Sequence, residues 1–421
     1  MFSPINKVVA ASYFHKISAV AACMLTAPVA IAQTTTSADS ITATTAQGAG
    51  ADKTRWYDKI SLRGYVQVRY NRLLETNPQL KTEYDKSVGD KGGFLIRRAR
   101  LVLSGDISER VYLYIQPDLA SSPSNSSLHY AQLRDAYFDV ALTKKKEYRL
   151  RVGQSKIPFG FENMQSSQNR LTQDRADGLN SALPNERDLG LIFYWAPAHI
   201  RERFSELASR RLKGSGDYGV FALGVYNGQT VNRAEANNNQ HLVTRVSYPI
   251  ALKNGQVIEP SLQAYTGTYT VTADQLSSNA IKGGDFKDRR VAASLVVYPQ
   301  PFGFQAEYNL GEGPEFDPAT STIKTKPLEG GYAQAMYFFK VAGQAFIPFV
   351  KAQYYNGGKK SETDARHSKV YETELGVEWQ PMSAFELAAQ YTISDRTTQD
   401  ARNLNNRQHG QFLRLQAQFN F

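Results

Sequence analysis

The sequence predicts an all-β fold, a transmembrane antiparallel β-barrel with sixteen strands as the favoured number. Three observations predict it. The last residues alternate between apolar and polar side chains, similar segments recur from Trp56 onward, and no long uncharged apolar run follows residue 32. Alternation with a period of two gives a strand one apolar and one polar face. Such strands can cross a membrane when they close into a barrel, because closure leaves no backbone edge unpaired in lipid.

The final segment, residues 410–421, shows the alternation most clearly. Its apolar face comprises Leu413, Leu415, Ala417, Phe419 and Phe421. The interleaved face comprises Phe412, Arg414, Gln416, Gln418 and Asn420. A terminal aromatic residue on such a strand resembles the C-terminal signature of bacterial outer-membrane barrels. The polar face would then line a pore, and the apolar face would contact lipid.

Sixteen segments show this alternation. They are residues 61–73, 94–106, 111–118, 132–142, 148–155, 189–196, 218–227, 242–250, 258–270, 290–299, 302–310, 332–340, 345–355, 369–379, 385–394 and 410–421. An even number suits a single-chain bacterial barrel, although the soft boundaries leave fourteen or eighteen strands open. A soluble sandwich or propeller also alternates. It needs no aromatic C-terminus, however, and a propeller requires sequence repeats that this chain lacks.

The N-terminus predicts export. Lys7 and Lys16 precede an apolar stretch that closes on an A-x-A cleavage pattern at residues 30–32, which is typical of a secretory signal peptide. We therefore expect a signal peptide at 1–32, a flexible periplasmic leader at 33–55 and the barrel at 56–421. Lipidation at Cys23, the only cysteine, is the alternative, but the apolar stretch before it is short.

Composition narrows the classes of function. Tyr (24) and Phe (21) are abundant, as expected for aromatic girdles at both membrane interfaces. Removing the signal peptide, with its two lysines and no acid, lowers the formal net charge from +10 to +8. In an exported protein this excess favours small anions or lipopolysaccharide phosphates as partners over nucleic acid. The localisation expected is the bacterial outer membrane.

Arginines on the polar faces are the candidate functional residues. Charge on the lipid face costs several kcal/mol, about 2–4 at the midplane, so arginines within strands should line the lumen. By the alternation, Arg98 and Arg100 share the inner face, whereas Arg97 lies in the lipid-facing register near the strand start. The other channel-lining candidates are Arg63, Arg69, Arg149, Arg151, Arg245 and Arg414.

Arginine suits such a wall because it never deprotonates and binds phosphate or carboxylate in a bidentate manner. The alternative is that these arginines pair with acids across the lumen and brace the barrel. The candidate acids are Asp118, Asp135, Asp139, Glu307, Glu372, Glu374 and Glu378.

The longest connection without a clear strand runs from residue 157 to 187. Long unstructured connections in compact proteins are more often functional than idle. A Pro/Gly bend at residues 156–160 could turn the chain inward, which predicts an inward-folded constriction loop. Its cationic candidates are Lys156, Arg170, Arg175 and Arg187. An ordinary surface loop is the alternative.

Several motifs resemble the phosphate-selective porin family, of the porin O and P type. They are FLIRRARL at 94–101, RDAYFD at 134–139, RVGQSKIPFGFE at 151–162, ERDLG at 186–190 and LRLQAQFNF at 413–421. The resemblance spans roughly Trp56 to Phe421. It implies a sixteen-stranded homotrimeric channel in which lumenal Arg and Lys guide anions such as phosphate or polyphosphate. The paired-arginine motif then makes Arg97 and Arg98 the constriction candidates, and Arg175 and Arg187 lie in the matching loop.

The charges of the predicted loop depart from a strongly basic channel. Its four cations are matched by Glu162, Asp174, Asp177 and Glu186. A neutral loop facing a basic wall gives a transverse field rather than an anion sink. A general or weakly selective solute porin is therefore the alternative to phosphate specificity.

Two other classes of function compete with a porin. A lipid hydrolase would need a Ser or His nucleophile–base pair, but no G-x-S-x-G motif occurs. An adhesion or scaffold barrel would bind a partner with its loops while its lumen is plugged. No metal-binding, P-loop or dinucleotide pattern appears, so no enzyme activity, cofactor or metal is expected.

Overall fold

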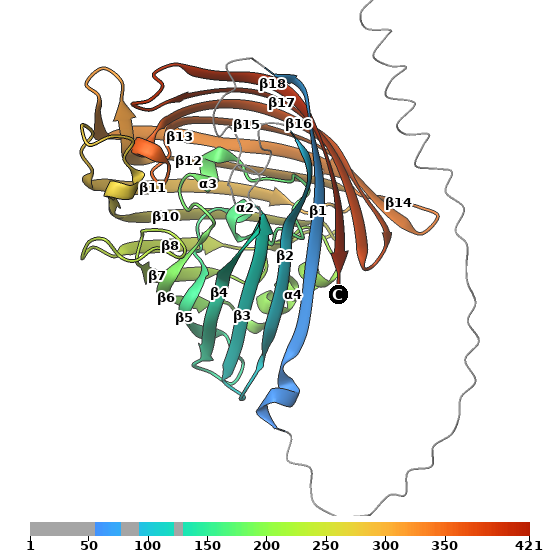
Figure 1. Ribbon diagram of the computed structural model, residues 1–421. Helices are drawn as coiled ribbons and strands as arrows, with labels where there is room; N and C mark the ends of the chain where they lie inside the picture. Colours follow the sequence, from blue (N-terminus) through green and yellow to red (C-terminus); the bar gives the residue numbers. More distant parts are fainter. Residues whose placement is uncertain (1–54, 77–91, 122–128) are drawn as a thin grey trace, which may run out of the picture. The chain divides into compact units, whose positions relative to one another are not determined.

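Strand pairing in the computed structural model, which describes residues 55–76, 92–121 and 129–421, closes a barrel (Figure 1). The first eight strands are β1 (Ser61–Thr76), β2 (Gly93–Asp106), β3 (Val111–Ser121), β4 (His129–Ala141), β5 (Tyr148–Lys156), β6 (Arg187–Trp195), β7 (Phe221–Tyr226) and β8 (His241–Ser247). The second eight are β10 (Val257–Val271), β11 (Gly284–Val297), β12 (Phe302–Asp317), β13 (Thr322–Tyr337), β15 (Gln344–Gly358), β16 (His367–Met382), β17 (Phe385–Gln399) and β18 (Asn406–Asn420).

Two short strands do not add to this number. β9 (Ile250–Ala251) pairs with β10, as β8 does, and β14 (Phe339–Val341) pairs with β15, as β13 does. The barrel is therefore a closed antiparallel sheet of sixteen strands, as the sequence predicts. Each of the sixteen predicted segments overlaps one of these strands.

The seam between β1 and β18 completes the barrel. Gln67 lies opposite Gln418, and the backbones of Gly64 and Phe421 exchange two hydrogen bonds of 2.8 and 3.0 Å. Glycine is required at position 64, because a Cβ atom there would lie 2.4 Å from the Arg100 carbonyl oxygen. The predicted signal peptide at 1–32 and nearly all of the predicted leader at 33–55 lie outside the described residues.

The two faces of the wall follow the alternation. On β1, Leu62 and Val68 are exposed on the outer face, while Gln67 and Arg69 are completely buried inside the barrel. The outer face thus carries the apolar side chains that lipid requires, and the inner face carries the polar ones. None of the helices among the described residues has the length and apolar character needed to cross a membrane.

A β-bulge in β2 corrects the predicted register of Arg97. Gln67 lies opposite Arg98, but the next residue, Val68, lies opposite Ile96, so β2 has one extra residue here. A bulge lets two neighbouring side chains serve the same face. Arg97 therefore does not face lipid: its guanidinium reaches Asp174 inside the barrel, 3.4 Å away.

Two long connections fill part of the interior. The inner segment, residues 157–186 between β5 and β6, contains α2 (Phe161–Met164) and α3 (Asp177–Asn180). Its apolar residues pack inside the barrel on wall residues of β6, β8, β10 and β11. The close approach of α3 to β13 depends on small residues, since a Cβ on Gly178 would lie 2.8 Å from the Gly330 backbone.

The second connection, residues 196–220 between β6 and β7, lies at the end of the barrel where β1 begins and β18 ends, here called the near end. It contains α4 (Ala198–Ser209), a helix that the sequence analysis did not predict. Ile200, Phe204 and Leu207 form its buried face, which belongs to one core cluster with Val257 and Tyr298. The remaining helical turns are η1 (Trp56–Lys59), η2 (Ala273–Gln275) and η3 (Thr363–Ala365).

Candidate functional site

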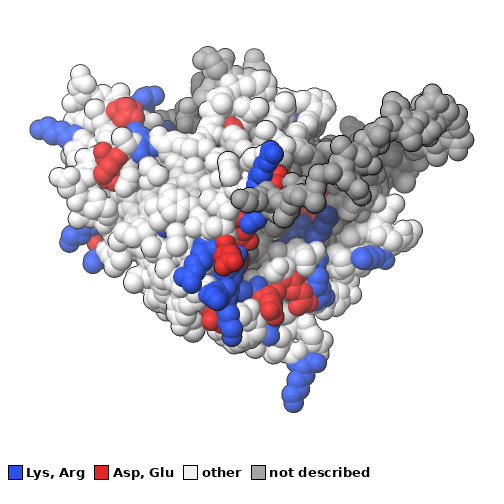
Figure 2. Space-filling view, turned by 90° about the horizontal axis from the view of Figure 1, so that it is seen from below, with Lys and Arg blue, Asp and Glu red and all other residues white. Residues whose placement is uncertain are grey.

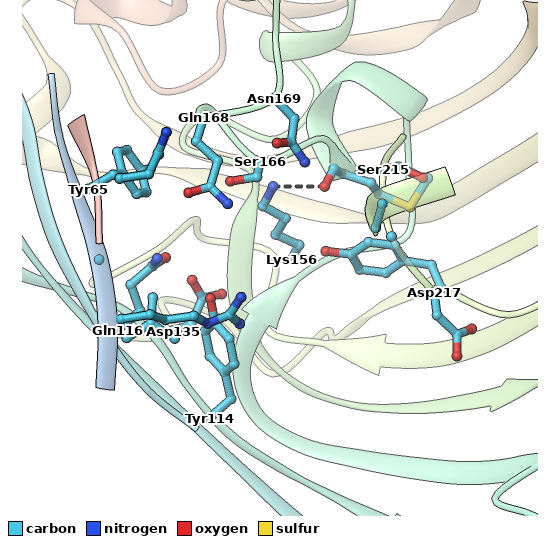
Figure 3. Close-up of a pocket in the computed structure, with 18 of the residues that line it drawn as sticks. Tyr65, Tyr114, Gln116, Asp135, Lys156, Ser166, Gln168, Asn169, Ser215 and Asp217 are labelled. Carbon is cyan, nitrogen blue, oxygen red and sulfur yellow. Dashed lines mark hydrogen bonds between the residues drawn. The ribbon is translucent and has the colours of Figure 1, made fainter. Parts of the chain in front are cut away.

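A cavity of about 540 Å³ lies inside the barrel, on the side of β1–β5. Three elements bound it: the wall strands, the inner segment and the segment that follows α4. Figure 3 labels Lys156, Ser166, Gln168 and Asn169 among its lining residues, together with Tyr65, Tyr114, Gln116 and Asp135 of the wall and Ser215 and Asp217 beyond α4. The opposite side of the lumen is occupied by the packed inner segment. Free space for a solute therefore lies along the first strands.

Three arginines converge on one carboxylate where the inner segment meets the seam. Asp174 lies 2.9 Å from Arg69 on β1 and 3.4 Å from Arg97 on β2, and it also pairs with Arg414 on β18. Burial alone would raise the pKa of the Asp174 carboxyl, but the charges of Arg69, Arg414 and Arg97 hold it well below its usual range. The cluster keeps a surplus of positive charge over this aspartate.

Three further buried cations lie in the inner segment and on the wall strands β2 and β5. Arg98, Arg170 and Lys156 are each 5–7% exposed, and no ion pair among the described residues includes any of them. Arg98 donates to the Gln67 side chain at 2.8 Å, and Lys156 donates to the carbonyls of Met164 and Gln165 at 2.8 and 2.6 Å. Arg98 and Lys156 therefore donate to neutral groups rather than directly to carboxylates, and a buried charge held in this way is costly.

Arg170 is the least satisfied of these cations. It donates only one long hydrogen bond, 3.4 Å to the Gln173 carbonyl, and its Nε and Nη1 atoms are buried without a partner in the described part of the chain. Arg98 and Arg170 thus both lack a carboxylate partner among the described residues, and an anion reaching either guanidinium would reduce the cost of burying it.

The other loop cations are compensated. Arg175 pairs with Glu186, and Arg187 lies 2.9 Å from Asp135 and 2.6 Å from Glu186. Burial alone would raise the pKa of the Glu186 carboxyl, but the charges of Arg175, Arg187 and Arg134 hold it well below its usual range. These contacts fasten the end of the inner segment to β4 and β6.

Most of the predicted wall arginines also have acidic partners. Arg100 pairs with Asp118 at 2.9 Å, Arg151 with Asp139 at 2.7 Å and Arg149 with Asp217 at 2.8 Å. Arg245 pairs with Glu259 at 2.9 Å, and Arg414 also pairs with Glu374 at 3.2 Å. Of the nine arginines predicted to line the channel, only Arg63 and Arg98 have no carboxylate partner among the described residues.

Three of the predicted bracing acids serve other partners. Glu307 accepts the backbone N–H groups of Phe161 and Glu162. Glu372 pairs with Arg396, which was not a candidate, and Glu378 pairs with Lys213. Acids on the far wall therefore fasten the two inserted connections as well as the wall itself.

Sequence reasoning missed the residues around α4. Lys213, Ser215 and Asp217 all line the cavity, yet none was a candidate. The signal was present as helical spacing, because Ile200, Phe204 and Leu207 recur at intervals of four and three. Four tyrosines of the cavity wall, Tyr65, Tyr112, Tyr114 and Tyr137, were also missed, and the Arg151 guanidinium lies 3.9 Å from the Tyr137 ring centre.

Figure 2 views the near end of the barrel, where basic and acidic side chains gather on one face. The connections at this end supply Lys144, Lys145, Lys146 and Arg201, and Lys146 pairs with Asp106 at 2.7 Å. No group of His, Cys, Asp or Glu that could hold a metal ion occurs in the ranges that the structure describes. The arrangement is that of a polar, charged passage.

Comparison with known proteins decides the family. The family described as "Phosphate-selective porin O and P" matches residues 75–421. The chain belongs to the phosphate-selective porin O and P family. No curated protein sequence shows a significant match to this porin.

Solved structures with the same fold are distant in sequence. The outer membrane channel DcaP of Acinetobacter baumannii is 14% identical with a TM-score of 0.51, covering 86% of the porin chain and 97% of its own. An anion-selective porin from Comamonas acidovorans is 10% identical with a TM-score of 0.51, covering 86% and 99%. OmpF of Salmonella typhi, in complex with daunomycin, is 11% identical with a TM-score of 0.53, covering 87% and 98%.

The family and the fold establish the general class of the protein. It is a bacterial outer-membrane porin that forms a channel, and both its family and its fold are those of channels, not of enzymes. Similarity at these identities shows the fold alone.

Proposed function

We propose that this porin is a water-filled channel for passive uptake of small anions, with phosphate or polyphosphate as candidate solutes. The observation that carries the proposal is the set of three buried cations without an ion pair among the described residues, Arg98, Arg170 and Lys156, of which Lys156 lines the cavity. An anion passing this point would replace the missing carboxylates. We expect the inner segment to act as the constriction, since it crosses the lumen at this level.

A solute can leave the channel only if each site binds it weakly or if several sites along the path share the binding. The paired arginines meet this requirement, because Asp174 and Asp118 already hold Arg69, Arg97, Arg414 and Arg100. An anionic solute must compete with these carboxylates, so it binds these arginines more weakly than it would bind guanidiniums without a carboxylate partner. We expect Arg98 and Arg170 to dominate selection, and the paired arginines to set the field through which anions approach.

The alternative is a general porin with a weak anion bias. The acids Glu162, Asp174, Asp177 and Glu186 of the inner segment favour it, since they outnumber its two arginines and give that segment a formal charge of −2. Of the distant structural relatives, one is described as anion-selective and another as an OmpF, so relatives support both readings. Phosphate preference is the part of the proposal that most needs measurement.

Reversal potentials in a KCl gradient across planar bilayers test the proposal. The unmodified channel should be anion-selective, and Arg98→Ala with Arg170→Ala should lower the anion-to-cation permeability ratio by about threefold or more, because two uncompensated charges leave the passage. Arg289→Ala is the matched control, since Arg289 is an exposed arginine on the outer face, paired with Glu312. A cation-selective unmodified channel would overturn the proposal, as would a double variant that behaves like the control.

Competition distinguishes phosphate from other anions. Chloride current recorded with added phosphate or pyrophosphate should fall if these anions occupy the Arg98–Arg170 region. In the double variant the same additions should have little effect. Equal currents with and without phosphate in the unmodified channel would instead favour the general porin.

Assembly and export complete the proposal. The family resemblance leads us to expect a homotrimer in the outer membrane, in contact with lipopolysaccharide, after export with cleavage of residues 1–32. The mass of the detergent-solubilised protein and its N-terminal sequence test these expectations directly. A monomer, or a mature chain that begins at Cys23, would contradict them.

A further inference from the structure

The chain between α4 and β7 crosses the barrel from one wall to the other. At one end, Lys213 is buried and its ammonium lies 2.5 Å from Glu378 on β16. At the other end, Asp217 lies 2.8 Å from both Arg149 on β5 and Arg201 on α4. We call residues 213–217 the crossbar.

The two anchoring strands lie almost opposite each other. Counted through the β1–β18 seam, β5 and β16 are seven positions apart in a ring of sixteen strands, where eight would be diametrically opposite. Five residues span at most about 17 Å, and Lys213 and Gly216 have positive φ, so the long side chains of Lys213 and Arg149 supply the rest of the reach. With these side chains, the crossbar connects nearly opposite walls of the lumen.

The lumen is closed on one side of the crossbar. There, the apolar face of α4 forms a core cluster with Val257, Val296 and Tyr298 of the wall or its turns. The other side is open, because Lys213, Ser215, Gly216 and Asp217 line the cavity opposite Tyr112 and Tyr114 of β3. A solute leaving the inner segment for the near end must pass between the crossbar and the first strands.

The centre of the crossbar consists of small residues. These are Gly214, Ser215 and Gly216, and Gly216 adopts a φ of +105° that favours glycine. The inner segment reaches the crossbar through the Gln165 side chain, which donates a hydrogen bond to the Lys213 carbonyl. The ion pairs at its two ends therefore do most to hold its position.

We propose that the crossbar is a second constriction of this porin, one that sets the size limit for solutes independently of the ion preference set beside the inner segment. The proposal rests on the channel function proposed above but not on its anion preference. The crossbar carries one cation and one acid, both already paired, and contributes no formal charge. Its effect on permeation is steric.

A variant that breaks the ion pairs at both ends of the crossbar tests whether it constricts the channel. We expect Lys213→Met with Asp217→Asn, which removes one cation and one acid and so keeps the formal charge unchanged, to raise single-channel conductance about 1.5-fold or more and to let larger neutral oligosaccharides enter in liposome-swelling assays. The anion-to-cation permeability ratio should stay close to that of the unmodified channel. Lys253→Met, in the exposed connection before β10, is the control at the same end of the barrel.

Two further variants keep the test decisive if the double variant folds poorly. Reversal of one pair, Lys213→Glu with Glu378→Lys, should restore the size limit that Glu378→Gln alone relaxes. Ser215→Cys in a Cys23→Ser background should lose about half its conductance when a bulky thiol reagent is attached, because Ser215 faces the passage. Heat-modifiable migration on gels checks folding of each variant.

The outcomes separate the two proposals. An unchanged conductance and sugar size limit in the folded double variant, or full conductance after thiol labelling of the Ser215→Cys variant, would overturn the crossbar as a constriction. That result would leave the anion preference untouched. A cation-selective channel with a relaxed size limit would instead overturn the anion proposal and keep the crossbar.

Discussion

The two connections that enter the lumen differ in how they are held. The inner segment is fastened all around the wall: it bonds to Arg69 on β1, Glu307 on β12, Lys351 on β15 and Gln390 on β17. The α4 connection is held on fewer sides, by one apolar helix face, by ion pairs at two points and by hydrogen bonds to near-end turns, such as that from Arg203 to the Pro249 carbonyl. The difference leads us to expect a division of labour, in which the firmly held inner segment acts on ions and the crossbar, which has no net formal charge, limits size.

The largest effect should follow from releasing the inner segment at its most buried ion pair. Lys351 is fully buried and lies 2.5 Å from Glu162. Lys351→Met leaves Glu162 buried without its cation, a loss of about 3–5 kcal/mol. We expect higher conductance with strong open-channel noise in bilayer recordings. Lys340→Met, an exposed change on β14, should have no effect; quiet, unchanged currents from Lys351→Met would show that this pair does not hold the segment.

A smaller effect should follow from removing the shared carboxylate. Asp174→Asn keeps the shape of the side chain but leaves Arg69, Arg97 and Arg414 without its charge. We expect the anion-to-cation permeability ratio to rise about threefold, because the surplus of positive charge grows. Asp395→Asn, in an exposed pair with Arg407, is the control. A lower ratio would mean that the arginines move away once Asp174 is neutral.

Matched truncations compare the two connections directly. Ile157 in the inner segment and Ile200 in α4 are both completely buried. Replacing either with valine costs about 0.5–1.5 kcal/mol. We expect Ile200→Val to increase conductance fluctuations, and Ile157→Val to leave the current steady because polar contacts still hold that segment. Equal behaviour of the two variants would remove the distinction between a fixed and a lightly held connection.

The smallest effect should come from moderate acid. The pKa of Glu186 is held well below its usual range, so its stabilising contribution is fully present above about pH 4.3, the usual glutamate pKa, and is lost only as pH falls through its folded value. Between pH 7 and pH 5 the ion pairs of Glu186 with Arg175 and Arg187 should therefore persist, so any conductance change in this range should be the same in a Glu186→Gln variant and in the unmodified channel. A conductance step that the Glu186→Gln variant lacks would mean that Glu186 is protonated there.

Local patterns in the sequence were sufficient to predict the barrel wall. Each strand carries its own alternation, so all sixteen could be found without knowledge of their partners. The inward orientation of Arg97 could not be predicted, because a bulge interrupts the period of two only when the pairing with Gln67 and Val68 is known. The α4 helix had a recognisable spacing, but a helix inside a barrel mouth is not expected from the alternation of its neighbours.

The candidate site was harder to predict than the wall. Arg98 and Arg170 lack carboxylate partners among the described residues, but this depends on which acids the fold brings near them. Asp174 pairs with arginines that are 77, 105 and 240 residues away in the chain. Sequence could name the cations, since arginines within strands must avoid lipid. It could not separate paired from unpaired ones, because that distinction arises from the docking of the inner segment.

The β1–β18 seam has a consequence for how the protein is made. Gln67 and Gln418 bond across 351 positions of sequence, and Phe421 bonds to Gly64. Until the last residues have been synthesised and exported, the edge of β1 has no partner and the sheet has two open edges. Contacts of such sequence separation also form slowly. A nascent or truncated chain therefore depends on being shielded from other strand edges, and closure of this seam is the step that makes the barrel self-contained.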